Sequence, residues 1–313
     1  MFLARGIAVS LAVFFVLYGF LSLATLAVFE VLSRVTKASV PFSAGVIFTL
    51  RILPFAGSAF FTLLLAVPSF YLLEPRGGEE ELGVVPAILA LGCVSLFAAG
   101  ILRAFFAQTR TAQVVAGWLE NAIVLQVSGA ATVFESTQPM PPLIAAGFRK
   151  PKVLISEPAL AVLTQAELSN ALRHELAHIH SRDNLKKLLF LCSPFPGMKR
   201  MESAWAEAAE IAADDAAVTN SADAVDLAAA LIKLSRLGAT PAQPHLTMGL
   251  IHDSPLTTRV ERLLHWETAH SASGLTRAWY VLPTAAAVSA ICVALSYSAA
   301  LTQLHLFTEW LVR

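Results

Sequence analysis

Charged residues are scarce in this sequence. Asp, Glu, Lys and Arg make up only 14% of the 313 residues, whereas 56% are hydrophobic and the mean hydropathy is +0.66. A soluble domain has about a quarter of its residues charged, so this composition predicts an integral membrane protein with membrane lipid as a partner. The formal net charge is zero and the pI is near 7.1, which excludes the basic surface that a DNA or RNA partner needs.

Cysteine is also rare. Of the three cysteines, Cys93 and Cys292 lie inside apolar runs and Cys192 stands alone. The sequence therefore has neither a paired disulfide framework nor a Cys-x-x-Cys metal-binding knuckle. No internal repeat or low-complexity tract stands out.

What the sequence does contain is four apolar segments long enough to cross a hydrocarbon core, which takes about 20 residues. Arg51 and Pro54, just before the second segment, are expected to mark a helix end at the interface. The segments predict transmembrane helices at about 6–32, 55–73, 84–102 and 278–301. The first is too long, and lacks a suitable cleavage site, to be a removable signal peptide. The predicted organisation is three transmembrane helices in 1–106, a soluble domain in 107–276, and a fourth helix with a short tail in 277–313.

The charges that flank these segments predict an orientation. Cytoplasmic loops are enriched in Lys and Arg, and the loops here alternate from basic to acidic to basic. The first loop has Arg34, Lys37 and Arg51, the second is "EPRGGEEEL" with one Arg and four Glu, and the third segment is followed by Arg103 and Arg110. We therefore expect a multi-pass protein of the inner (plasma) membrane, with the soluble domain in the cytoplasm and both termini outside.

The predicted soluble domain has an α+β pattern. Four β-rich pieces at 122–127, 131–136, 142–148 and 152–156 predict a small sheet. Thr164 and Glu167 have the spacing of a capping box, so a helix is expected to start there and to run to the turn "SPFPG". Further helices are predicted over about 199–218, from Ser221 to Gly238, and from Ser254 onward.

The sequence "HELAH" lies within the first of these helices. His174 and His178 are one helical turn apart, so their imidazoles project from the same face and can hold one metal ion. Glu175, beside the first histidine, can reach a water at an open coordination position. The alternative is an ordinary amphipathic helix that carries histidines on its surface, as is expected of His180.

A hydrolytic zinc site needs a third protein ligand from another element. The stretch "EAAEIAADD" places Glu210 and Asp214 four residues apart, so that Glu210 can bind the metal while Asp214 orients a ligand histidine. Glu207, one turn earlier on the same face, is the competing ligand. The alternative is that these acids form a solvated helix face. The short "SPFPG" turn allows this helix to fold back antiparallel against the first.

These motifs resemble those of the BlaR/MecR-type integral-membrane zinc metallopeptidases, which are related to the HtpX and CAAX prenyl protease peptidases. The resemblance covers the apolar segments, the strand region ending in "AGFRKPKVLIS", "LTQAELSNALRHELAHIHSRD" and "EIAAD". It implies a membrane α-helical protein of four transmembrane helices with a cytoplasmic α+β zincin-like metallopeptidase domain. It also implies one Zn²⁺ per chain bound by His174, His178 and Glu210, with Glu175 as general base and Asp214 orienting a ligand.

The sequence departs from the antibiotic sensors of that family at its end. Those sensors have a penicillin-binding domain after the fourth span, whereas only "TQLHLFTEWLVR" follows it here, so β-lactam sensing is not supported. The segment "HDSPLTTRVERL" is similar to an "HP…R" segment of the related peptidases. The resemblance implies that His252 meets the substrate or the active-site cleft, and that Arg259 either does the same or holds its helix in place.

Two functions remain open at this stage. The first is a zinc-dependent endopeptidase that cuts a protein or peptide substrate, such as a regulator in a signalling pathway, with a separate sensor or regulator protein as a further partner. The second is a non-catalytic membrane transducer or scaffold with a metal-stabilised domain. Glu175 favours the enzyme, because a structural zinc site has no use for a water-activating carboxylate. The "PPLIAAGFRKPKVLIS" segment is either an exposed strand edge that pairs with an extended substrate or a buried hairpin.

Overall fold

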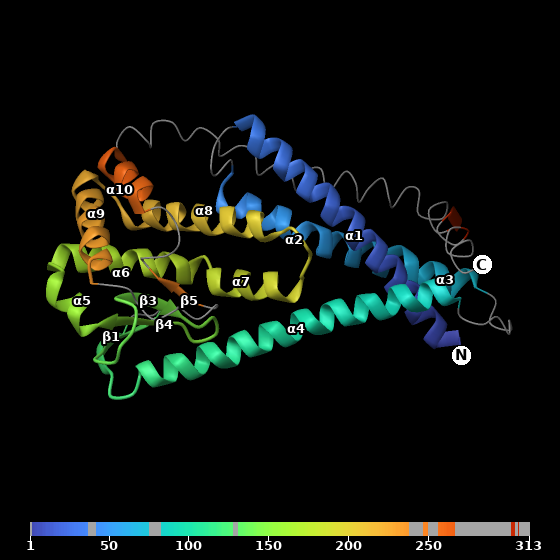
Figure 1. Ribbon diagram of the computed structural model, residues 1–313, viewed down its shortest axis with the longest axis horizontal. Helices are drawn as coiled ribbons and strands as arrows, with labels where there is room; N and C mark the ends of the chain where they lie inside the picture. Colours follow the sequence, from blue (N-terminus) through green and yellow to red (C-terminus); the bar gives the residue numbers. More distant parts are fainter. Residues whose placement is uncertain are drawn as a thin grey trace.

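The computed structural model describes residues 2–36, 42–74, 83–127, 131–237, 247–249, 256–266 and three positions near the C-terminus, 302, 303 and 306. The described part is mostly helical and contains one small sheet (Figure 1). The predicted fourth span at 278–301 lies outside the described residues.

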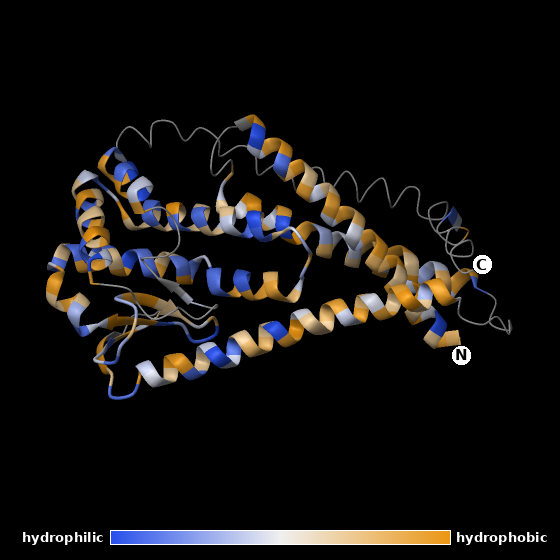
Figure 2. Ribbon diagram, viewed as in Figure 1, coloured by the Kyte–Doolittle hydropathy of each residue, from blue (hydrophilic) through white to orange (hydrophobic). Residues whose placement is uncertain are grey.

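Within the described residues, three helices are long and apolar enough to cross a membrane. Apolar side chains that point outward along them are exposed, as for Phe20, Leu63 and Leu91, and Figure 2 shows the hydrophobic colouring along these helices. The first is α1 (Phe2–Thr36), the second comprises α2 (Ala44–Phe61), the π-helical turn η1 (Thr62–Ala66) and α3 (Val67–Leu73), and the third is α4 (Val84–Trp118).

The second helix differs from its prediction, which was wrong in two respects. It begins at Ala44 rather than near Phe55, and it passes through Pro54 instead of ending there. Arg51, expected at the interface, is only 2% exposed. A proline inside a helix costs about 3 kcal/mol. Here the first half of α2 packs against the later helix α8 (Lys199–Ala217), and that contact is available only in the tertiary structure.

In the part of the chain that the structure describes, the sheet has five strands in the order β1-β2-β4-β3-β5, and β2 and β4 are the parallel pair. The four predicted strands are confirmed as β1 (Ile123–Val127), β2 (Thr132–Ser136), β3 (Leu143–Ala146) and β4 (Lys152–Ser156). The sequence did not predict β5 (Thr247–Gly249), which pairs antiparallel with β3. It covers the edge of β3 that had been considered for substrate pairing.

Both faces of the central strands are covered. Leu143, Val153 and Ile155 point into a core shared with the helices α6 (Gln165–His180), α9 (Ser221–Ser235) and α10 (Leu256–Leu264), whereas Ile144 and Leu154 pack against the end of α4. This alternation follows from the two-residue period of a strand. It also explains why α4 continues beyond the predicted end at Leu102, because its last turns cover the sheet.

Six more helices, α5 to α10, are found among the described residues. A single long helix had been expected from Thr164 to the "SPFPG" turn, but the chain breaks at Arg182, which adopts a left-handed conformation with φ of 55°. The predicted capping box is confirmed, with Thr164 and Glu167 exchanging hydrogen bonds. The helices are α5 (Glu157–Val162), α6 (Gln165–His180), α7 (Asp183–Cys192), α8 (Lys199–Ala217), α9 (Ser221–Ser235) and α10 (Leu256–Leu264).

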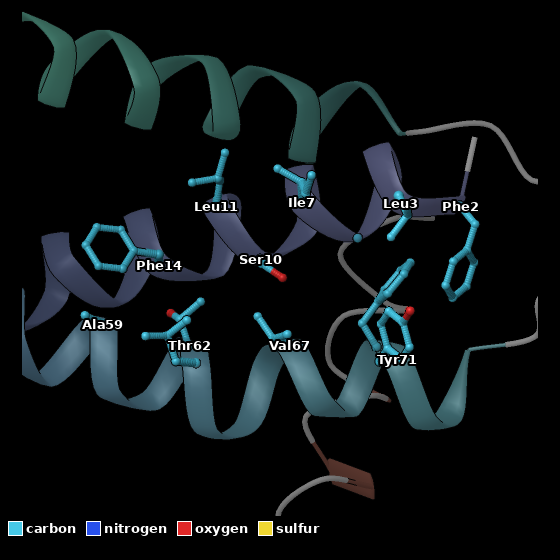
Figure 3. A pocket seen from close by; sticks show the side chains of 13 residues that line it. Phe2, Leu3, Ile7, Ser10, Leu11, Phe14, Ala59, Thr62, Val67 and Tyr71 are labelled. Atoms are coloured by element: carbon cyan, nitrogen blue, oxygen red, sulfur yellow. The ribbon is translucent and has the colours of Figure 1, made fainter.

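An apolar pocket of about 420 Å³ lies between α1 and the η1–α3 part of the second helix (Figure 3). Its walls include Ile7, Phe14, Val67 and Tyr71. None of the residues singled out for metal binding or catalysis lines it, so this pocket is separate from the candidate metal centre.

Candidate metal centre

Two elements bring the predicted ligands together. His174 and His178 project from one face of α6, and their Nε2 atoms are 3.1 Å apart. Glu210 comes from α8, which runs back along α6 (Figure 1). Its Oε2 lies 3.5 Å from Nε2 of His174, and its Oε1 lies 3.6 Å from Nε2 of His178. The predicted antiparallel return of this helix is what places the carboxylate beside the imidazoles.

This geometry fits a single metal ion. A tetrahedral zinc ion has ligands at about 2.0–2.1 Å, so neighbouring ligand atoms are separated by roughly 3.4 Å, close to the separations seen here. All three residues are buried, and their ligand atoms lie within 4.8 Å of one another. Two imidazoles and one carboxylate are also a donor set that suits zinc.

Asp214 and Arg259 lie next to the cluster of His174, His178 and Glu210. Oδ1 of Asp214 lies 3.0 Å from Nδ1 of His174, on the ring edge opposite the metal position. Nη1 of Arg259 in α10 forms an ion pair with Oε2 of Glu210 at 2.8 Å, and the same guanidinium binds Asp214. Asp214 therefore has the position expected of a residue that orients a ligand histidine.

The charges in this cluster perturb one another strongly. Burial opposes charge on the His174 imidazole, but the carboxylates of Asp214 and Glu210 prevail and raise its pKa to about 9. Burial likewise acts to raise the pKa of Glu210, yet the nearby histidines and Arg259 hold that pKa well below its usual range. The pKa of Asp214 is also lowered, against the effect of burial, by Arg259 and His174. Two carboxylates are thus kept ionised in a buried site, which suits the binding of a cation.

Glu175 has a different environment. It is fully buried, and burial raises the pKa of its carboxyl group to about 7, although the neighbouring histidines act in the opposite direction. The backbone of Ala145 in β3 approaches it closely enough to lower the pKa slightly. Among the described residues, neither carboxylate oxygen has a hydrogen-bond partner of good geometry. Such a carboxyl group can take up and release a proton near neutral pH.

The contact between Asp183 and His178 was not predicted from the sequence. Oδ2 of Asp183 lies 2.8 Å from Nδ1 of His178, and Oδ1 of Asp183 accepts a hydrogen bond from Lys186. Each histidine therefore has a carboxylate on the ring nitrogen that faces away from the metal position. The available signal was the acid in "HSRD", five residues after His178. It was overlooked because an unbroken helix would not bring that acid back to the histidine.

The other residues considered for the site differ in their position relative to the metal cluster. Glu207 is only partly buried and is not part of the cluster, so the structure favours Glu210 as the third member. His180 is exposed, as predicted, and interacts with the backbone oxygen of Leu176. His252 lies outside the described residues. Arg259 is 4% exposed and is directed at the two carboxylates. A contact between Arg259 and a substrate stays a prediction.

Comparison with known proteins does not assign the chain to a family. No family model matches it, and no curated protein sequence matches it.

Proposed function

We propose that this protein is an integral-membrane, zinc-dependent endopeptidase of the BlaR/MecR type. The observation that carries the proposal is the buried group of His174, His178 and Glu210, with the fully buried carboxyl group of Glu175 beside it. A purely structural zinc site usually has four protein ligands and needs no such carboxyl group. The proposed organisation includes a fourth transmembrane helix and a zincin-like domain between the third and fourth helices.

The proposed reaction is hydrolysis of a peptide bond. A zinc ion held by His174, His178 and Glu210 would supply a Lewis acid that activates water and polarises the scissile carbonyl. Glu175 removes a proton from the attacking water and delivers it to the leaving amine, which its pKa of about 7 permits. Asp214 and Asp183 keep the ring orientation of the two histidines through their Nδ1 atoms.

The proposed substrate is a protein or peptide, and a regulator in a signalling pathway is the favoured class. The site is proposed to face the cytoplasm, because of the basic residues that flank the apolar segments. A separate sensor or regulator protein would supply the signal. The competing function is a membrane transducer whose α+β region is stabilised by metal without catalysis.

The deciding experiment compares Glu175→Gln with wild type. This substitution keeps the size and the hydrogen-bonding shape of the side chain but removes the proton acceptor. Zinc content and folding should stay unchanged, while peptide-bond cleavage should fall by about a hundred- to ten-thousandfold. Glu207→Gln, a similar change on a partly buried residue outside the cluster, is the control and should cleave like wild type. Wild-type cleavage by Glu175→Gln would reject the peptidase and favour the transducer.

A further inference from the structure

The turn between α7 and α8 is inserted among the three apolar helices. Tyr18 of α1 donates its hydroxyl to the backbone oxygens of Ser193 and Pro194, at 2.9 and 3.1 Å. Gly100 of α4 lies directly against the same turn, since a Cβ there would be 2.7 Å from Cδ of Pro194 and 2.9 Å from the backbone oxygen of Leu191. The turn between α7 and α8 therefore contacts the apolar helices directly.

Arg51 of α2 joins the two helices that meet at this turn. Its Nη2 donates to the backbone oxygens of Phe190 and Ser193, at 3.2 and 2.9 Å, and so binds carbonyl groups at the end of α7. Its Nε donates at 2.9 Å to Oε1 of Glu202, in the first turn of α8. One buried guanidinium therefore holds the end of α7 and the start of α8 at a set separation. Its planar arrangement of donors makes this possible, whereas a lysine ammonium has no such fork.

The same two helices carry parts of the candidate metal centre. α7 begins with Asp183, which contacts His178. On α8, Glu210 follows Glu202 by eight residues, or about 12 Å of helix. The intervening residues Trp205 and Ala208 are buried against α2 and α7. Because an α-helix moves as a rigid rod over this length, a displacement at Glu202 is transmitted to Glu210.

We propose that Arg51 is a positioning residue for the metal centre. By holding α7 and α8 together at their turn, it sets the distance of Glu210 from His174 and His178, although it touches none of them. A rearrangement of the apolar helices would reach the site through this contact. The inference rests on the proposed function, because it assumes that the cluster binds metal.

The test uses the full chain loaded with Co²⁺, whose visible absorption reports the coordination geometry. Arg51→Lys keeps the charge and removes the fork of donors. Arg200→Lys is the matched control, because Arg200 also joins the start of α8 to an apolar helix, through Glu30 of α1, but at an exposed position. Arg51→Lys should weaken Co²⁺ and Zn²⁺ binding about tenfold, the lower end for changes to residues that support metal ligands. It should also alter the cobalt spectrum, whereas Arg200→Lys should match wild type.

A folded Arg51→Lys protein with wild-type affinity and spectrum would overturn the proposal. Should this variant fail to fold, Tyr18→Phe removes one hydroxyl from the same turn. A cobalt spectrum of Tyr18→Phe that differs from wild type supports positioning through this turn, and a wild-type spectrum rejects it. Metal affinity and the cobalt spectrum are measured without a substrate, so their result does not depend on the peptidase test. Failure of Glu175→Gln to lose cleavage leaves the Arg51 result standing, whereas wild-type protein that binds neither ion would overturn both proposals.

Discussion

Arg259 binds Asp214 through two parallel hydrogen bonds, from Nε to Oδ2 at 2.8 Å and from Nη2 to Oδ1 at 2.6 Å. Both side chains are almost fully buried. Asp214 in turn contacts His174, so the guanidinium of α10 supports a residue of α6 through one of α8. Arg259 also holds Glu210 and thereby balances the charge of two buried carboxylates.

Replacing Arg259 by Ala should strongly destabilise the metal-free protein. The substitution leaves two buried carboxylates without their cation, and breaking a buried ion pair in this way costs about 3–5 kcal/mol. Denaturant unfolding in detergent measures the loss. Arg262→Ala is the control, because it removes the neighbouring but partly exposed pair with Asp215 and should cost under about 1 kcal/mol. Equal losses in the two variants would contradict this account.

Purified wild-type protein should contain one zinc ion per chain. His178→Ala should lose the metal because one of three ligands is removed, whereas His180→Ala, two residues away and exposed, should retain it. Elemental analysis of the purified proteins measures the zinc content of each variant. If Glu210→Ala retained zinc and Glu207→Ala lost it, the third ligand would be Glu207, one helical turn earlier.

Asp183→Asn should weaken zinc binding without abolishing it. The carboxylate makes the imidazole of His178 a better ligand, and loss of such a partner reduces metal affinity about 10- to 100-fold. Competition with a chelator measures the change. Lys186→Ala removes the other partner of Asp183 and should leave the affinity close to wild type. If both variants lose affinity equally, the ion pair with Lys186 is the important contact.

Stability should depend on pH through Glu167. Burial acts to raise the pKa of this carboxyl group, but Lys233, 2.7 Å away, and the amide of Thr164 lower it below the usual 4.5. A depressed pKa in the folded state means that the stabilisation is complete above about pH 4.5 and is lost as the pH falls through the folded-state pKa. The difference in unfolding free energy between wild type and Glu167→Gln should therefore be largest near neutral pH and shrink in acid. A difference that grows in acid would contradict the sign.

Reporter fusions test the orientation. Gly77 and Gly238 lie outside the described residues, in segments that are predicted to be on opposite sides of the membrane. A reporter at Gly77 should indicate the outside and one at Gly238 the cytoplasm. The same side for both would mean that the chain crosses the membrane once fewer, or once more, between them than predicted.

The sequence alone determined the features that depend on neighbours along the chain. Apolar segments of sufficient length predicted the first three long helices, short β-rich pieces predicted four strands, and the spacing of Thr164 and Glu167 predicted a capped helix. The spacing of His174 and His178 placed both imidazoles on one face. Each of these follows from the length, composition or residue spacing of one segment and needs no knowledge of what packs against it.

The tertiary structure determined which faces of the helices and strands contact one another. Those contacts decided the features of the site that the local sequence did not predict. Glu207 and Glu210 are equivalent by spacing, and only the way α8 lies on α6 places Glu210 at the histidines. The break at Arg182 returns Asp183 to His178, and the packing of α2 on α8 buries Arg51 in a helix that continues past Pro54. The physical reason is the same in each case. A contact between residues far apart in the chain can outweigh a local conformational preference of a few kcal/mol, and the local sequence carries no record of that contact.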